Sequence, residues 1–238
     1  MPGGNGALKR ASPYARRMQI SIDGQVVPFD GQPDNPTLQQ VFDGLQFLMT
    51  QGQVHEAGPD GVVEERLIVR VVVDGQPVLP ADLELMMGKD VSDSELEFET
   101  MAQRDVMGVV LQDAAAKLRE VAVAQREAAE SFQADEAPAA FEKLSAAITG
   151  WIEVSSAVTQ SAALANVELD TLTVEAEGEV VTASALAQEL AAQLGEVKST
   201  LETRDISALA DVVGYEWAPL SEKWIGIVEQ LGDRIAAQ

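Results

Sequence analysis

The stretch Ile20-Ser21-Ile22-Asp23-Gly24-Gln25-Val26-Val27 decides the fold of the first part of this chain, and its pattern returns in Val71-Val72-Val73-Asp74-Gly75-Gln76-Pro77-Val78. Asp-Gly between β-branched residues is a strong hairpin signal, because the tight turn needs positive φ, which glycine adopts at no steric cost. Each stretch therefore predicts a β-hairpin. The apolar run at residues 67–73 is expected to be a central strand, and its partner strand is expected to reach Leu79.

A helix is predicted between the two hairpins, where apolar residues recur at helical spacing at Leu38, Val41, Phe42, Leu45 and Leu48. Thr37 and Gln40 form a capping box before this helix, and Gly52 is expected to end it. Beyond the second hairpin, residues 95–99 alternate strictly, which predicts a strand with Leu96 and Phe98 pointing inward. The ββαββ order predicts a small β-grasp-like domain over residues 18–100.

From Gln103 the hydrophobic period changes to 3.6 residues, which predicts an all-helical domain over residues 101–238. Helices are expected at about 103–132, after Pro138, at about 186–201 and from Asp205, and Pro219 must kink or divide the last one. The connector before the third helix has the pattern of a short hairpin around Gly178. The expected apolar stripes include Val110, Phe141, Ile152, Leu194 and Leu201. The predicted fold class is α+β, a β-grasp-like domain followed by a helical bundle.

The chain is strongly acidic, with 39 Asp and Glu against 16 Lys and Arg and a formal charge of −23. Such a surface repels phosphate groups, so nucleic acid and anionic membranes are poor partners, whereas a basic protein is attracted. The alternative is that the charge serves solubility or adaptation to a salty cytoplasm. The absence of cysteine excludes disulfides and thiolate chemistry. The longest apolar runs are too short for a membrane span, which favours a cytoplasmic protein.

The first seventeen residues differ from the rest of the chain. They contain Lys9, Arg10, Arg16 and Arg17 and no acidic residue, so residues 18–238 carry a charge of −27. The segment contains Gly and Pro and has no hydrophobic period, which predicts a flexible basic arm. Met18 directly precedes the first predicted strand, and the alternative is that translation starts there.

Catalytic chemistry has little support in the sequence. His55 is the only histidine and lies in a Gly/Pro loop, where a surface histidine is expected. Carboxylates gather at residues 90–95 and 175–179 and could collect a divalent cation, but solvated turns are the simpler interpretation in so acidic a chain. No Walker A, dinucleotide-binding or Gly-x-Ser-x-Gly motif occurs. We therefore expect no catalytic residue, no metal site and no cofactor.

Aromatic residues make up only 5% of the chain, yet Tyr215, Trp217 and Trp224 fall within ten positions around Pro219. Tyr and Trp are enriched at interface hot spots, and a proline break would splay a helix to present them. The three residues are therefore the candidates for partner binding. The alternative is that they cover the bundle core, and Trp224, which lies on an apolar stripe, fits this alternative best.

These motifs carry two resemblances. Residues 18–100 resemble a ubiquitin-like β-grasp module, on both Asp-Gly hairpins, the helix at 37–52 and the strand at 95–99. The whole layout is similar to an uncharacterised family of acidic bacterial proteins, with matching pieces in Met18-Gln19-Ile20-Ser21-Ile22-Asp23-Gly24, Phe141-Glu142-Lys143-Leu144, Gly150-Trp151-Ile152 and Tyr215-Glu216-Trp217-Ala218-Pro219-Leu220. The second resemblance implies a bacterial protein and brings no activity, cofactor or binding residue.

The sequence thus predicts a non-catalytic, protein-binding adaptor, chaperone-like or assembly protein of the bacterial cytoplasm. The helical domain would carry the partner site, and an amphipathic helix filling a gap between helices is the expected mode of binding. Two alternatives stay open. One is a self-assembling structural protein that forms homo-oligomers, and the other is an enzyme that uses carboxylates and a bound metal.

Overall fold

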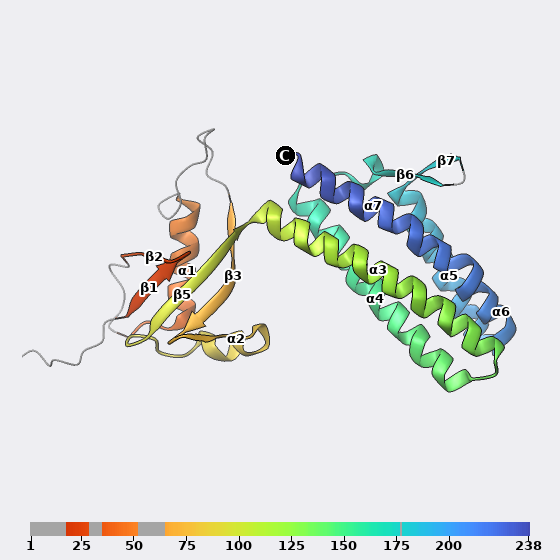
Figure 1. Cartoon of the computed structure of the whole chain (residues 1–238), viewed down its shortest axis with the longest axis horizontal. Coiled ribbons are helices and arrows are strands. Elements are labelled where there is room, and N and C mark those ends of the chain that lie inside the picture. Colours follow the sequence, from red (N-terminus) through yellow and green to blue (C-terminus); the bar gives the residue numbers. More distant parts are fainter. Residues whose placement is uncertain (1–17, 29–34, 52–64, 177) are drawn as a thin grey trace, which may run out of the picture. The chain divides into compact units, whose positions relative to one another are not determined.

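The computed structural model describes residues 18–28, 35–51, 65–176 and 178–238. Within them the chain is a mixed α+β protein, with a small sheet near the N-terminus and helices toward the C-terminus (Figure 1). The chain divides into two compact units, residues 1–103 and 104–238, which we name the N-terminal unit and the helical unit. In the described part, no helix combines the length and the apolar composition that crossing a membrane requires.

The N-terminal unit contains a five-stranded sheet. Its strands are β1 (Gln19–Ile22), β2 (Gln25–Val26), β3 (Arg66–Val73), β4 (Gln76–Pro77) and β5 (Glu95–Ala102), in the order β2-β1-β5-β3-β4. β1 and β5 run parallel, and all other neighbours are antiparallel. Both Asp-Gly turns form as predicted, with a φ of 50° at Asp23 and 78° at Gly24, and 52° at Asp74 and 75° at Gly75.

The centre of the sheet is β5, which lies between β1 and β3. Its predicted alternation is confirmed, since Leu96 and Phe98 are buried while the glutamates beside them are exposed. The strand predicted at residues 67–73 does lie between two neighbours, β5 and β4, but it is not covered along its whole length. β4 pairs with only the last two residues of β3, and Val69, at a shift of register with β5, is 46% exposed. A bulge re-aims a side chain, so this apolar run is not covered on both faces.

Helix α1 (Leu38–Thr50) packs on one face of the sheet (Figure 1). The predicted capping box is confirmed: the Thr37 N–H donates to Gln40 Oε1 at 3.0 Å, and the Gln40 N–H donates to Thr37 Oγ1 at 3.4 Å. Gly52, the expected end of this helix, lies outside the described residues. Helix, sheet and the loop before β5 share a core of Ile20, Ile22, Leu38, Val41, Leu45, Val71, Val91, Leu96 and Phe98.

A second helix of this unit, α2 (Pro80–Met87), is not predicted by the sequence analysis. The strand expected to reach Leu79 ends at Pro77, and α2 begins at Pro80. Pro80 was the available signal, because proline suits the first helical turn, where an N–H has no partner. Helix α2 buries no residue fully, and its apolar residues do not recur at helical spacing, so the pattern does not reveal the helix.

Four long helices share one core in the helical unit: α3 (Gln103–Gln133), α4 (Ala137–Leu164), α5 (Ala183–Thr203) and α7 (Ala218–Ala236). Between α4 and α5 lie a 3₁₀ turn, η1 (Leu169–Thr171), and the predicted hairpin, β6 (Thr173–Ala176) and β7 (Glu179–Thr182). Between α5 and α7 lie α6 (Ile206–Asp211) and a π-helical turn, η2 (Val212–Trp217). As predicted, Asp205 caps α6 and Pro219 divides the last helix.

The predicted apolar stripes are largely confirmed, since Leu111, Leu118, Leu144, Leu186 and Leu231 among others are buried in the core, but five of their members are not. Five residues that the stripes place inside have side chains that are 37% to 66% exposed: Val110, Phe141, Ile152, Leu194 and Leu201. Alanines are buried instead, and α3 alone buries Ala114, Ala115, Ala122, Ala128 and Ala129. Small residues allow helices to approach closely, so the contact faces include alanines that a pattern of large apolar residues does not register.

Candidate functional site

The three aromatic candidates lie in very different surroundings. Tyr215 is 72% exposed on η2, whereas Trp217 is completely buried and Trp224 is 7% exposed. Trp224 packs edge to face against Trp151 of α4, with ring centroids 6.1 Å apart. Trp217 and Trp224 therefore belong to the core of the helical unit, and Tyr215 is the one of the three whose side chain faces solvent.

Residues two positions apart lie on opposite faces of a helix, and on η2 Trp217 faces the core while Tyr215 faces solvent. Pro219 has no N–H for the preceding turn, and a π-helical turn accommodates this loss by widening the helix. The turn packs closely on α3, since a Cβ added to Gly214 would stand 2.8 Å from Ala129 Cβ. From the side of α5, Gln193 Nε2 donates to the carbonyl oxygen of Glu216 at 3.3 Å. Contacts with two helices thus fix Trp217 inside and Tyr215 outside.

Buried polar side chains join α3 to α7 next to this turn. Ser221 Oγ donates to Gln125 Oε1 at 2.8 Å, and both residues are fully buried. Within the described residues, the indole N–H groups of Trp151, Trp217 and Trp224 have no hydrogen-bond partner. These groups are enclosed by packed helices, so they are not accessible to a partner, and a buried N–H without a hydrogen bond costs stability.

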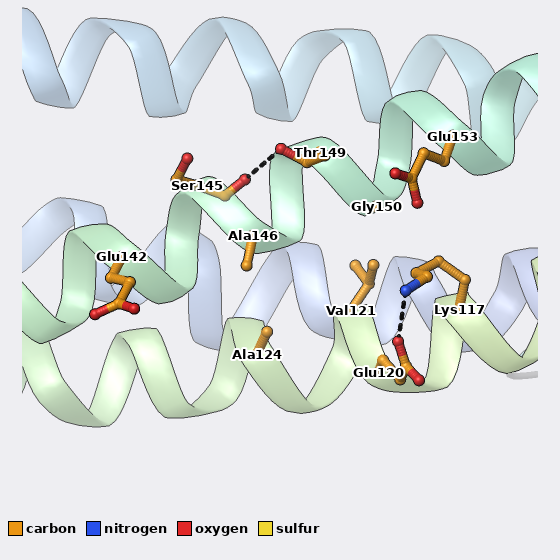
Figure 2. Close-up of a pocket in the computed structure, with 10 residues that line it drawn as sticks. All are labelled: Lys117, Glu120, Val121, Ala124, Glu142, Ser145, Ala146, Thr149, Gly150 and Glu153. Atoms are coloured by element: carbon orange, nitrogen blue, oxygen red, sulfur yellow. Dashed lines mark hydrogen bonds and ion pairs between the residues drawn. The ribbon is translucent and has the colours of Figure 1, made fainter. Parts of the chain in front are cut away.

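An open groove lies between α3 and α4. It consists of two hollows, of about 450 Å³ and about 220 Å³, which share Lys117 and Glu153 as lining residues. Figure 2 shows the larger hollow, with Glu142 and Glu153 of α4 at its two ends and Val121 of α3 pointing toward Gly150. Small or apolar residues form the floor of what we name the α3–α4 groove: Val110, Ala114, Val121, Ala124, Ala146, Gly150, Val154 and Ala157.

Gly150 determines how closely the two helices approach. A Cβ on this residue would stand only 2.5 Å from Val121 Cγ2. Val121 is itself buried and β-branched, so its side chain has one strongly preferred rotamer in a helix and cannot turn aside easily. The two helices therefore meet at this contact. On either side of it Val110 and Ala146 are exposed and Ala124 and Ala157 are partly exposed, whereas Ala114 and Val154 are buried.

The charges of the α3–α4 groove are mainly negative. Four carboxylates line it, at Asp113, Glu120, Glu142 and Glu153, against the single ammonium group of Lys117. Lys117 Nζ donates to Glu120 Oε2 at 2.7 Å. This hydrogen bond and the charge of Glu120, followed by the charge of Glu153, raise the pKa of Lys117, which therefore stays protonated at neutral pH.

Two of these carboxylates have no partner within the described part of the chain. Neither Asp113 nor Glu142 makes a side-chain hydrogen bond or an ion pair there. Lys117 is already engaged by Glu120, so it does not compensate them. The groove thus keeps negative charge that is available to a cationic partner.

Another hollow, separate from the α3–α4 groove, has a volume of about 440 Å³ and lies between α3 and α7. Arg119 of α3 and Glu229 of α7 line it and form an ion pair, with Arg119 Nη2 2.8 Å from Glu229 Oε1. The two charges compensate each other across the hollow. It therefore offers a partner less charge than the α3–α4 groove does.

Some of the residues considered for catalysis or metal binding lie outside the described part of the chain. His55 and Glu177 lie outside the described residues. In the cluster at 90–95, Asp90 Oδ1 accepts the Ser92 N–H at 2.9 Å, and this bond, followed by one from the Ser92 side chain, lowers the pKa of Asp90. Within the described residues, no group of three or more His, Cys, Asp or Glu is arranged to hold a metal ion.

The aromatic cluster stands out in the sequence, whereas the α3–α4 groove does not. The floor of the groove is built mostly of alanine, glycine and valine, and no motif marks them. One signal was present, namely that small residues and carboxylates recur at helical spacing on α3 and α4, at Asp113, Lys117 and Glu120 and at Glu142, Ala146 and Glu153. Comparison with protein-family models, curated proteins and solved structures finds no match to this chain.

Proposed function

We propose that this chain is a non-catalytic, protein-binding protein, an adaptor, chaperone-like or assembly protein, and that its helical unit carries the partner site. The observation that carries the proposal is the α3–α4 groove. It extends over the fourteen-residue step from Val110 to Ala124, which is about 20 Å at 1.5 Å per residue. An open groove with a small, partly apolar floor and a polar rim is the surface that peptide and helix partners use.

The aromatic candidates take different parts in this proposal. Tyr215 is an exposed aromatic side chain on a turn packed against two helices, which is a favourable arrangement for a contact residue. Trp217 and Trp224 contribute through the core, because they hold η2 and α7 in place. We therefore locate the main partner surface at the α3–α4 groove and keep Tyr215 as a separate contact.

For the N-terminal unit we propose a β-grasp-like fold. The order β2-β1-β5-β3-β4, the parallel pairing of β1 with β5 and the helix that follows the first hairpin support this assignment. The resemblance to acidic bacterial proteins, and a place in the bacterial cytoplasm, belong to the same proposal and rest on the sequence motifs. Function is argued from the helical unit, since a shared fold does not imply a shared function.

Site-specific crosslinking in the source cells tests the proposed function. A photo-crosslinking amino acid replaces Ala146, an exposed residue of the groove, in the full chain, and the matched control carries it at Ala192, an exposed alanine of α5. We expect a discrete adduct with a second protein from position 146 and none from position 192, with the partner identified by mass spectrometry.

Two other outcomes would contradict the proposed adaptor. An adduct at twice the 25.4 kDa mass of the chain would instead favour the self-assembling structural protein. Adducts of equal yield from both positions, or from neither, would show that the groove binds no protein selectively. Circular dichroism of both variants establishes that each chain is folded before the comparison is made.

A further inference from the structure

The lining of the α3–α4 groove follows the period of a helix. On α3 the lining residues recur three or four positions apart, at Val110, Ala114, Lys117, Val121 and Ala124. On α4 the corresponding floor is made by Ala146, Gly150, Val154 and Ala157. Helices pack by placing the ridge of one between the ridges of its neighbours, and small floor residues let a third helix approach closely. The small floor residues on both helices therefore leave room for a third helix along the groove.

The distribution of charge identifies the complementary partner. Asp113 and Glu142 are exposed acids toward opposite ends of the groove, and Glu153 lies where its two hollows meet. The one cation of the groove, Lys117, is held by Glu120 at 2.7 Å. A cationic side chain entering from outside would therefore meet the carboxylates of Asp113 and Glu142, which have no competing partner within the described part of the chain.

We propose that the α3–α4 groove binds a basic amphipathic helix, whose apolar stripe lies over the alanine and valine floor and whose Lys or Arg residues flank that stripe and pair with Asp113, Glu142 and Glu153. This inference rests on the proposed function and adds the chemistry of the partner. About four helical turns, or about 14 residues, cover the 20 Å of the groove. The apolar stripe supplies affinity, and the charges supply orientation and a faster encounter.

The test uses synthetic probes and the full chain. The first probe is a fluorescent peptide of about 14 residues, built from leucine and lysine so that it is amphipathic as a helix. In the second, glutamate replaces every lysine, and in the third, glycine replaces every leucine. Fluorescence anisotropy measures binding at about 0.1 M salt. We expect the leucine–lysine peptide to bind and the other two to bind at least about tenfold more weakly, because each lacks one of the two required contacts.

Paired variants locate the binding on the protein. Glu142→Gln together with Glu153→Gln should weaken the leucine–lysine peptide about three- to tenfold, the range expected for two exposed ion pairs. Glu168→Gln together with Glu196→Gln removes the same charge from exposed sites outside the groove and should leave the affinity within about twofold. Ala146→Phe obstructs the groove and should abolish binding, whereas Ala192→Phe on α5 should not.

Several results would overturn the inference. Equal weakening by both pairs of glutamate variants would show a general attraction of cations to an acidic protein. Binding of the glutamate peptide, or of none of the probes, would exclude a basic helix as the partner, while the crosslinking at Ala146 would still decide whether the groove binds a protein. If a chain that begins at Met18 binds the leucine–lysine peptide much more tightly than the full chain does, then the cations of residues 1–17 compete for the groove in the full chain.

Discussion

Asp23 and Asp74, the aspartates of the two Asp-Gly turns, also bind the central strand. Asp23 Oδ1 accepts the Thr100 N–H at 2.8 Å, near the end of β5, and Asp23 Oδ2 accepts the Thr100 hydroxyl at 2.6 Å. Asp74 Oδ1 accepts the N–H of Glu95, at the start of the same strand, at 2.9 Å. The repeat seen in the sequence therefore has a second consequence besides turn formation, because each turn aspartate holds one part of β5.

Gly150 and Gly195 are two helical glycines with different structural roles. Gly150 is buried against Val121, where a Cβ would stand 2.5 Å from Val121 Cγ2, whereas a Cβ on Gly195 of α5 would meet no atom within 4 Å. The first glycine is required by packing. The second lies in a helix interior, where glycine costs stability relative to alanine without any packing benefit.

We therefore predict opposite effects of the same substitution. Gly150→Ala should destabilise the helical unit by about 1–3 kcal/mol through overpacking, and Gly195→Ala should stabilise it by about 0.5–1 kcal/mol through helix propensity. Urea unfolding followed by tryptophan fluorescence measures both, since all 3 tryptophans lie in α4, η2 and α7. The same sign for both substitutions would refute the packing role of Gly150. A double-mutant cycle with Val121→Ala then assigns the strain to that pair.

At the scale of elements, the sequence predicts well what depends on neighbouring residues. The hairpins, the capping box at Thr37 and the division at Pro219 each follow from local backbone chemistry, and each is confirmed. The alternation of β5 is confirmed for the same reason, since period two places every second side chain inside. The prediction was incomplete where tertiary contacts decide, as in β3, which lies between two strands but whose second neighbour is only two residues long.

The candidate site was less accessible to prediction than the fold. A helix of any kind places Tyr215 and Trp217 on opposite faces, but which of the two faces inward depends on how η2 packs on its neighbours, and the sequence pattern does not show this. The α3–α4 groove depends on two helices meeting at Gly150, about 30 residues beyond Val121 in the chain. Pattern analysis within one helix does not reveal which of its faces a second helix covers.

The π-helical turn gives a prediction of its own. Gln193→Ala should destabilise the helical unit by about 0.5–1.5 kcal/mol, because it removes the side chain that donates to the carbonyl oxygen of Glu216 through a part-buried hydrogen bond. Gln188→Ala, at an exposed position of the same helix, should change stability by no more than about 0.5 kcal/mol. The measurement is again urea unfolding by tryptophan fluorescence. Equal effects of the two substitutions would show that this hydrogen bond does not support η2.

At the scale of the whole molecule, the charge of −23 acts on the fold and on binding in opposite directions. Ion pairs between helices, such as Arg119 with Glu229 and Lys223 with Glu189, are solvent-exposed or partly so and contribute little each. The large excess of acids over bases in both units instead gives repulsion between like charges in the folded chain. Salt screens this repulsion, and it also screens the attraction of the α3–α4 groove for a cationic helix.

Raising sodium chloride from about 0.05 M to about 0.5 M should therefore stabilise the fold while weakening the leucine–lysine peptide. We expect a melting temperature higher by roughly 2–4 °C, which corresponds to about 1 kcal/mol for a chain of this size, and an affinity lower by about tenfold. Thermal unfolding by circular dichroism and peptide anisotropy in the same buffers measure the two effects. A melting temperature that falls with salt would mean that the ion pairs outweigh the repulsion. Affinity independent of salt would mean that the carboxylates of the groove do not contact the helix.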